Sequence, residues 1–357
     1  MNICIFLHNI SSGGGTERMA VSLANELIQR GHNLHIVSLA PTGDPFFPLR
    51  QGVTLHSLNI PVSQLTTRYF AAIKKLRAFL KSNAVNVIID VDVILSVISI
   101  PACWRTATKV IAWEHYNYFV KRESKVRAWG RKLAARKAAA VVTLTEEDAR
   151  NYKKNCTCKA KIIAIPNFIA ALPAETASPN NHIVLAVGHL IHRKGFDILV
   201  KAWGLLKAEG LDGWKLHIAG DGEEKENLFE LVRTLQLEQD VVFLPPATNI
   251  AGYYLSAAVY VMSSRAEGFG MVLIEALSFG LPAVSFNCKL GPAEIIRNGV
   301  DGFLVSPEDV QELKDKLHIL LRRDDLRNTM AANARKGAAR FLSHEIIPQW
   351  VALLNTL

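Results

Sequence analysis

Two carboxylates lie eight positions apart in a glycine-containing stretch of the second half of the chain. Glu267 precedes the Gly-Phe-Gly loop 268–270, and Glu275 lies within the helical pattern 271–279. Glycines let the backbone approach a ligand closely, and the N–H groups at a helix start attract anions. We therefore predict a site for an extended, phosphate-bearing ligand. The two carboxylates would address different parts of it, since a helix rises about 1.5 Å per residue.

A basic pair occurs upstream, in a turn bounded by Gly188 and Gly195. Arg193 and Lys194 lie in this turn, after the apolar strand pattern 183–187. Guanidinium and ammonium groups are suited to neutralising a diphosphate. We expect this pair to bind the phosphates of the same ligand.

The first half of the chain contributes a histidine and a run of glycines. His115 follows the strand pattern 109–113, and ligands of open α/β sheets bind at the carboxyl ends of strands. The alternative is a structural histidine bonded to a loop carbonyl. The three glycines 13–15 join a strand to a helix, and we expect this loop to bind a phosphate or the edge of a substrate. The pattern is not G-x-G-x-x-G and lacks the acidic residue that an NAD ribose needs, so a dinucleotide site is not favoured.

These motifs resemble, in order and context, those of the retaining glycosyltransferases of family four, which have the GT-B fold. Residues 263–286 resemble the E-x7-E segment of that family, and Glu114, His115 and Asn117 match its Ser-Glu-His-Asn segment. Trp113 and Tyr116 depart from that segment. The resemblance covers nearly the whole chain and is strongest in its second half.

The resemblance implies a role for each candidate residue. Glu267 would touch the donor sugar, Glu275 would bind ribose hydroxyls, and His115 would contact the sugar near the reacting carbon. Arg193 and Lys194 would stabilise the departing nucleotide. The implied catalytic set is His115, Glu267, Arg193 and Lys194. The implied donor-binding set is Gly14, Gly15, Gly188, Arg193, Lys194, Gly268, Phe269, Gly270, Met271, Val272 and Glu275.

A metal ion is not expected at this site. Asp90-Val91-Asp92 matches the short D-x-D of metal-dependent sugar transferases, but two acids at a strand end are common. The GT-B resemblance implies binding of the donor phosphates without a metal. A phosphorylase of similar fold would need a lysine for pyridoxal phosphate, and no such pocket is evident. We therefore predict no cofactor, with a nucleoside diphosphate sugar as co-substrate.

Two domains are expected for 357 residues, since one core rarely grows so large. Alternation of strand and helix patterns stops at the Ala-, Pro- and Ser-rich stretch 170–181 and restarts at residue 183. The alternation predicts an α/β protein with two Rossmann-like doubly wound domains, and the resemblance implies the GT-B class, with the domains facing across a cleft. By that resemblance, the acceptor domain is 1–169 with 343–357, the linker is 170–181, and the nucleotide-sugar domain is 182–342.

Charge is distributed unevenly between these halves. Residues 1–168 contain 23 Lys and Arg against 10 Asp and Glu, a net of +13, whereas residues 169–357 have a net of −4. The segment 121–137 has eight cations and one acid, and the basic amphipathic pattern 66–83 precedes it. A solvated charged face is the alternative to an anionic partner. We predict that acceptor or membrane contacts involve Lys121, Arg122, Lys125, Arg127, Arg131 and Lys132.

The function expected is transfer of a hexose or N-acetylhexosamine from a nucleoside diphosphate sugar, most plausibly a UDP-sugar, with retention at the anomeric carbon. The expected acceptor is a lipid-linked glycan or lipopolysaccharide in bacterial surface polysaccharide synthesis, and no nucleic acid partner is expected. Residues 1–5 lack a basic signal-peptide region, the apolar stretch 85–103 is broken by two acids, and the five cysteines suit reduced thiols. We expect a cytoplasmic protein associated peripherally with the anionic inner face of the membrane. A non-enzymatic α/β module that binds membrane or RNA would explain the basic half but not the E-x7-E stretch.

Overall fold

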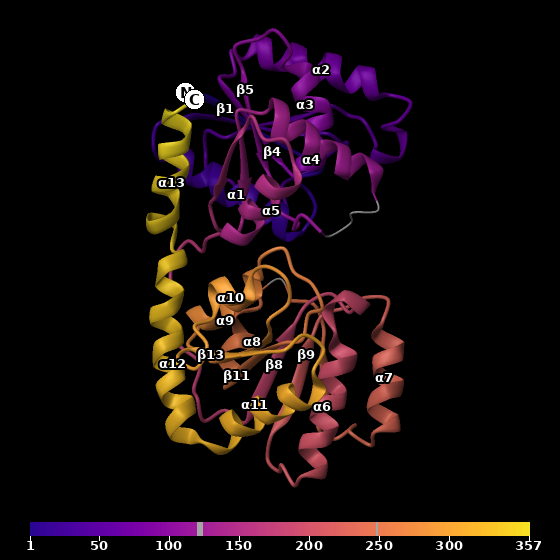
Figure 1. The fold of residues 1–357 in the computed structure, drawn as a ribbon, viewed down its shortest axis with the longest axis vertical. Coiled ribbons are helices and arrows are strands. Elements are labelled where there is room, and N and C mark those ends of the chain that lie inside the picture. The colour runs from indigo at the N-terminus through magenta and orange to yellow at the C-terminus, as the bar shows by residue number, and fades with distance from the viewer. Residues whose placement is uncertain (120–123, 248) are drawn as a thin grey trace. The chain divides into compact units, whose positions relative to one another are not determined.

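The structure is a computed structural model that describes residues 1–119, 124–247 and 249–357 (Figure 1). The chain forms two compact units. Unit 1 contains Met1–Ala170 and Ser343–Leu357, and unit 2 contains Ala171–Leu342. Each unit is a parallel β-sheet with helices on both faces, which is the doubly wound arrangement that the strand and helix patterns predict.

Unit 1 is built on a parallel sheet in the order β3-β2-β1-β4-β5-β6-β7. Its strands are β1 (Asn2–Leu7), β2 (Asn33–Ser38), β3 (Thr54–Ser57), β4 (Val87–Val91), β5 (Lys109–Trp113), β6 (Ala140–Thr143) and β7 (Lys161–Ala164). Its helices are α1 (Gly15–Ile28), α2 (Tyr69–Ser82), α3 (Ser96–Ala102), α4 (Lys125–Lys137), α5 (Glu146–Asn155) and α13 (Ser343–Asn355).

The strand order of unit 1 reverses between β1 and β4, where open α/β sheets bind ligands at the carboxyl edge. The glycine loop 13–15 follows β1 at this edge, and His115 follows β5. Helices α2, α3 and α4 pack side by side, and α13 packs on α1. Trp350 of α13 is fully buried against Trp113, with ring centroids 4.8 Å apart.

Unit 2 is built on a parallel sheet in the order β10-β9-β8-β11-β12-β13. Its strands are β8 (Ile183–Val187), β9 (Lys215–Ala219), β10 (Val241–Leu244), β11 (Val259–Met262), β12 (Ala283–Phe286) and β13 (Gly302–Val305). Its helices are α6 (Phe196–Ala208), α7 (Lys225–Thr234), α8 (Ala251–Ser256), α9 (Met271–Ser278), α10 (Pro292–Ile295), α11 (Val310–Arg322) and α12 (Asp324–Ala338).

In unit 2 the strand order reverses between β8 and β11. The loop with the basic pair follows β8, and the loop with Glu267 follows β11, so the two motifs share the switch point of one sheet. Residues 171–181 form no helix or strand and are tied to unit 2. Arg335 donates to the Pro173 carbonyl at 2.7 Å and Arg327 to the Pro179 carbonyl at 2.7 Å.

Thr16, a residue type favoured at N-caps, does not cap α1. The cap is Gly14, and Thr16 already lies in the first turn. The Thr16 hydroxyl donates to the Glu17 carboxylate at 2.8 Å, so it is not used for capping. Gly14 caps the helix in an extended conformation and without a side-chain hydrogen bond, so α1 begins at Gly15, within the glycine loop.

All five cysteines are free thiols. Within the described ranges, no helix combines the length and apolar character needed to cross a membrane.

Candidate functional site

The loops after β8 and β11 lie directly against each other in unit 2. Gly195 has a φ of 64°, and a Cβ added there would lie 2.0 Å from the Ser263 carbonyl oxygen. Arg265 donates its backbone N–H to the Arg193 carbonyl at 2.8 Å, and its guanidinium makes paired 2.8 Å bonds to Asp197. Only glycine permits this approach at position 195, so the glycine at the end of the basic turn is needed to join the two motifs.

A buried ion pair links these loops. Lys194 Nζ lies 2.6 Å from Glu267 Oε1, and the Ser264 hydroxyl donates to the same oxygen at 2.6 Å. Burial alone raises the pKa of Glu267, but Lys194 and the hydrogen bond from Ser264 outweigh it and hold that pKa below its ordinary value. Glu267 therefore carries its negative charge at neutral pH, next to a lysine that compensates it.

The start of α9 follows this pair at once. Gly270 caps the helix with a φ of 104°, and the first N–H groups of a helix have no acceptor within it. Gly291, also at a φ of 104°, lies beneath the loop, where a Cβ would meet the Phe269 carbonyl oxygen at 1.9 Å. The backbone of the Gly-Phe-Gly loop is thus held close to Gly291, with the partial positive charge of α9 behind it.

Glu275 lies one turn into α9 and is nearly buried. Its Oε2 accepts a hydrogen bond from the Tyr254 hydroxyl at 2.9 Å, and the Tyr254 ring stacks on Phe279 at 5.2 Å. A carboxylate has several acceptor positions, and paired hydroxyl groups such as those of a ribose are donors that suit it.

The histidine of unit 1 is held in an apolar environment. The His115 ring packs against Trp113 with centroids 4.2 Å apart, and burial lowers the pKa of His115 to about 4. Its Nε2 is buried and has no hydrogen-bond partner among the described residues. His115 is therefore neutral at physiological pH and retains an unused polar atom.

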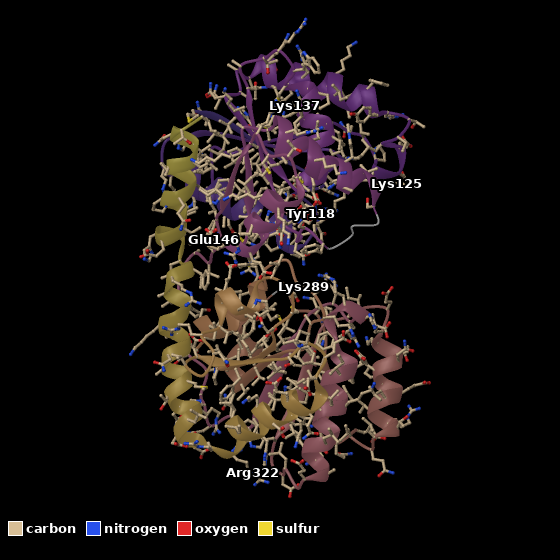
Figure 2. All side chains as sticks on the ribbon, viewed as in Figure 1. Tyr118, Lys125, Lys137, Glu146, Lys289 and Arg322 are labelled. Carbon is tan, nitrogen blue, oxygen red and sulfur yellow. The ribbon has the colours of Figure 1, made fainter. Side chains whose placement is uncertain are left out.

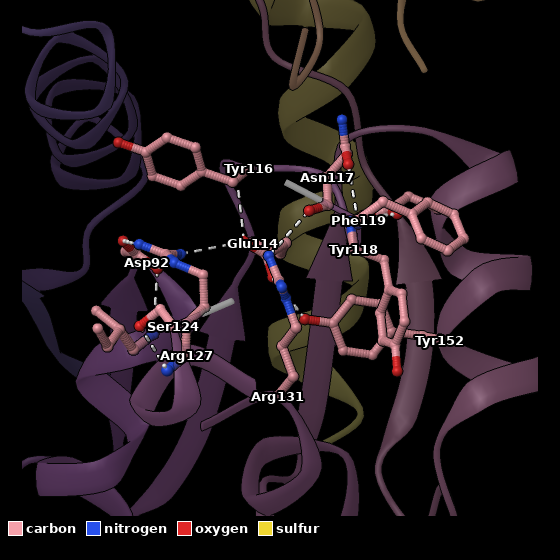
Figure 3. A network of polar contacts seen from close by, with 12 residues as sticks. Asp92, Glu114, Tyr116, Asn117, Tyr118, Phe119, Ser124, Arg127, Arg131 and Tyr152 are labelled. Atoms are coloured by element: carbon pink, nitrogen blue, oxygen red, sulfur yellow. Dashed lines mark hydrogen bonds and ion pairs between the residues drawn. The ribbon is translucent and has the colours of Figure 1, made fainter. Parts of the chain in front are cut away.

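A buried polar network fixes the loop around this histidine (Figure 3). The Glu114 Oε2 accepts from Arg131 Nε at 2.8 Å and from the Tyr152 hydroxyl at 2.7 Å. Arg131 also donates to the Asn117 carbonyl at 2.9 Å. Since Glu114 and Asn117 flank His115, helices α4 and α5 hold both sides of the histidine loop.

A second arginine of α4 joins the network at Asp92. Arg127 makes two hydrogen bonds to the Asp92 carboxylate, at 2.6 and 2.7 Å, and lies 3.7 Å from Glu114 Oε1. Asp92 has a φ of 111°, which is strained for a residue other than glycine. At the end of β4, the Asp92 carboxylate accepts from the Ile94 N–H at 3.1 Å as well as from Arg127 of α4.

The two arginines of α4 require a correction. The sequence places Arg127 and Arg131 on an acceptor- or membrane-facing surface, but they are only 5% and 2% exposed and are paired inside unit 1. Lys125 and Lys132 are exposed on the same helix. Lys121 and Arg122 lie outside the described residues.

The structure groups the predicted donor residues by unit. Unit 2 brings together Gly188, Arg193, Lys194, Glu267, Gly268, Phe269, Gly270, Met271, Val272 and Glu275 around the ends of β8 and β11 and the start of α9. Gly14, Gly15 and His115 belong to unit 1, at the carboxyl edge of its sheet.

The two acids of the D-x-D pattern have separate protein partners. Asp90 accepts from Ser96 and Ser99 at 2.7 and 2.6 Å, while Asp92 pairs with Arg127. In the part of the chain that the structure describes, no cluster of three or more His, Cys, Asp or Glu is placed to hold a metal ion.

Several partners at the site are not predicted from the sequence. Ser264 follows a short apolar strand, and the small polar residues at that strand end are the signal for it. Tyr254 is 21 residues from Glu275, and Tyr152 is 38 residues from Glu114, so spacing gives no hint of either contact.

Family models match both halves of the chain. The model described as Glycosyltransferase Family 4 matches residues 13–171, and the model described as Glycosyl transferases group 1 matches residues 169–337. The two matches meet where the chain passes from unit 1 to unit 2.

The chain is also similar to whole proteins. It is 34% identical to an uncharacterized glycosyltransferase of Haemophilus influenzae, over 99% of both chains. It is 31% identical to the amylovoran biosynthesis glycosyltransferase AmsD of Erwinia amylovora, also over 99% of both. A Campylobacter jejuni α-1,4-N-acetyl-D-galactosaminyltransferase, named for its undecaprenol-linked glycan substrate, is 27% identical over 99% of this chain and 98% of its own.

The fold has solved counterparts. HepE of Anabaena, crystallised with UDP and glucose, superposes with a TM-score of 0.83 at 20% identity, over 99% of both chains. This likeness establishes the GT-B fold, and the relatives above establish the activity class. With its paired switch-point loops and its E-x7-E stretch, the chain belongs to the family 4 glycosyltransferases.

Proposed function

We propose that this glycosyltransferase moves a hexose or N-acetylhexosamine from a UDP-sugar to a hydroxyl of a lipid-linked glycan or lipopolysaccharide, with retention at the anomeric carbon. The observation that carries the donor assignment is the buried Lys194–Glu267 pair at the start of α9. HepE, which was crystallised with UDP, supports the choice of nucleotide.

Charge stabilisation is the main contribution of unit 2 to the proposed reaction. Breaking the anomeric C–O bond develops negative charge on the departing diphosphate. Lys194, Arg193 and the N–H groups at the start of α9 supply preorganised positive charge for that group. Glu267 stays ionised beside Lys194 and accepts hydrogen bonds from the sugar, and Glu275 binds the ribose.

Retention is proposed from the family resemblance, and since no protein nucleophile is evident among the described residues, we propose attack from the leaving-group face. Glu267 Oε1 is already bonded to Lys194 and Ser264. The acceptor hydroxyl would attack from the face that the diphosphate leaves, forming the new C–O bond as the old one breaks. Its proton would pass to an oxygen of the departing phosphate. We assign neutral His115 to a hydrogen bond with a sugar hydroxyl through Nε2.

The acceptor class is inferred from the relatives and from charge. The names of the Erwinia and Campylobacter proteins place them in polysaccharide synthesis and on an undecaprenol-linked glycan. The first 168 residues carry a net charge of +13, which suits an acceptor borne on phosphorylated lipid at the inner face of the membrane. Membership of an enzyme family removes the reason to prefer a non-enzymatic module.

The test is binding of nucleotides followed by product analysis. UDP should raise the Tm of the protein more than GDP does, and the Glu275→Gln variant should lose most of that shift. Proton NMR of the product should show the donor's anomeric configuration, and EDTA should leave the rate unchanged. An inverted product, or activity lost to EDTA and restored by manganese, would overturn the corresponding part of the proposal.

A further inference from the structure

We propose that the outer surface of α2, α3 and α4 in unit 1 docks onto an anionic lipid bilayer, with Trp104 and Trp129 inserted at headgroup level. We call this surface the docking face. The inference rests on the proposed lipid-borne acceptor. It concerns a different part of unit 1 from His115, because the two tryptophans line a groove at the amino ends of β5 and β6.

Among the residues that the structure describes, the docking face exposes cations and no carboxylates. Residues 45–145 contain only four acids. Asp90, Asp92 and Glu114 are at most 4% exposed, and Glu123 lies outside the described residues. Its exposed cations are Arg68, Lys74, Lys75, Lys81, Arg105, Lys109, Lys125, Lys132, Arg136 and Lys137; Figure 2 labels Lys125 and Lys137 at the two ends of α4.

Two tryptophans are exposed among these cations. Trp104 is 66% exposed after α3, and Trp129 is 51% exposed on α4. Both line an open groove of about 560 Å³ whose other walls include Ile100, Val110 and Leu133. The remaining four tryptophans of the chain are at most 5% exposed, so the exposure of these two is specific to this face.

The turn that carries Trp104 is held in place by α2. Arg77 donates to the carbonyls of Ala102 and Trp104 at 3.1 and 2.7 Å. Arg105 follows with a φ of 56°, a conformation that costs about 1 kcal/mol for a residue with a side chain. A tethered and strained turn that presents a tryptophan to solvent is typical of a contact surface.

The chemistry of the groove favours lipid over nucleic acid. Tryptophan beside lysine and arginine is the pattern of interfacial membrane segments, where the ring lies between headgroups and acyl chains. The groove walls include the aliphatic residues Ile100, Val110 and Leu133, which suit acyl chains. Arg105, Lys109 and Lys137 at its rim would each contribute about 1 kcal/mol near an anionic surface.

The experiment uses the full chain and vesicles without donor or acceptor. Phosphatidylglycerol vesicles with brominated acyl chains should quench the tryptophan fluorescence, and phosphatidylcholine vesicles should not. Flotation should show recovery on phosphatidylglycerol that falls as salt rises. Recovery should drop at least tenfold for Trp104→Ser/Trp129→Ser and for Lys109→Glu/Lys137→Glu.

Matched controls lie in unit 2. Lys201→Glu/Arg233→Glu makes the same charge change on exposed positions of α6 and α7 and should float like the wild type. The UDP-induced Tm shift should be the same in all variants, so a failure of the donor assignment would be seen separately. Equal recovery on neutral vesicles, or an unchanged Trp104→Ser/Trp129→Ser variant, would overturn the docking face. If polyuridylate binds the docking face and displaces the vesicles, the partner of this face would be a nucleic acid and not a lipid bilayer.

Discussion

At the residue scale, the proposed donor site contains charges that already have partners. Lys194 and Glu267 neutralise each other in surroundings that exclude most water. Removing one member of such a pair leaves a buried charge without compensation, which typically costs about 3–5 kcal/mol. The two residues therefore contribute to the stability of unit 2 as well as to the proposed chemistry.

This coupling predicts different outcomes for the two partners. Lys194→Ala should lower the stability of unit 2 by about 3 kcal/mol and abolish donor binding, because Glu267 remains ionised and buried. Glu267→Gln should cost less stability than Lys194→Ala, because the lysine that it leaves unpaired is the more exposed member of the pair. Turnover should fall roughly 100-fold, because the amide keeps the hydrogen-bonding shape without the charge. Calorimetry and initial rates would measure both. A Lys194→Ala protein of unchanged stability would contradict the buried pair.

Asp90 provides a test of pH dependence. Burial, opposed by hydrogen bonds from Ser99 and Ser96, raises the pKa of Asp90 to about 7, above its ordinary value of 3.8. The folded state therefore binds the proton more tightly, and its stability falls as pH rises between these two values. Relative to Asp90→Asn, the wild-type Tm should fall by roughly 5 °C from pH 5 to pH 8. Circular dichroism melts would show this, and parallel pH profiles would contradict it.

Local sequence context and the density of charge lead to different candidate residues at this scale. Glu267, Glu275 and Lys194 are predicted as site residues because glycines and strand ends surround them. Arg127 and Arg131 are misplaced because a run of cations is read as exposed. Their spacing of four positions puts them on the inward side of α4, and the acids that attract them are distant in sequence.

At the element scale, the site depends on how closely three loops approach one another. The loop after β11 lies against the turn after β8 on one side and against Gly291 on the other. These approaches use backbone atoms, so side-chain substitutions elsewhere in the loops should be tolerated better than substitution of the glycines between them.

Gly291→Ala should therefore damage the proposed donor site indirectly. The added methyl group would lie 1.9 Å from the Phe269 carbonyl oxygen, and the loop before α9 must move to admit it. We expect UDP to bind at least tenfold more weakly, measured by titration calorimetry. Gly299→Ala is the control, since it has a similar left-handed φ of 78° but no atom within 4 Å of the new methyl group. If both variants bind UDP equally well, the loop does not depend on this packing.

The elements themselves are largely predictable from pattern. The buried strands β1, β5, β8 and β11 are short apolar runs, and the helices begin near the glycines and polar caps that the sequence shows. The edge strand β3 is not predicted, because Thr54–Ser57 is mostly exposed and has no apolar run. Its place depends on pairing with β2, which is a tertiary contact.

At the scale of the whole molecule, the chain leaves unit 1 after Ala170 and returns to it at Ser343. The restart of the βα pattern and the low-complexity stretch 170–181 make two units predictable. The return of α13 is expected only from the family resemblance, because an amphipathic helix does not reveal which sheet it covers. In the structure, Trp350 of α13 packs on Trp113, so α13 covers the sheet of unit 1.

Trp350→Ala should destabilise unit 1 by about 3–5 kcal/mol, because a fully buried ring is removed from its core. The same substitution at Trp129, which is half exposed, should change the melt by less than about 1 kcal/mol. Differential scanning calorimetry with and without UDP would assign the transitions, since the nucleotide should stabilise unit 2. Equal effects of the two substitutions would mean that α13 does not complete the core of unit 1.

The position of α13 also determines the order in which the domains mature on the ribosome. Residues 171–342 are translated before Ser343–Leu357, so unit 2 has its full sequence while unit 1 still lacks the helix that covers Trp113. Translation adds about 5–20 residues per second, so the nascent unit 1 lacks α13 for roughly 10–40 s after Ala170 has been added. During this interval its apolar surface is open to chaperones and to aggregation, so the amino-terminal domain should be the later of the two to reach its native state.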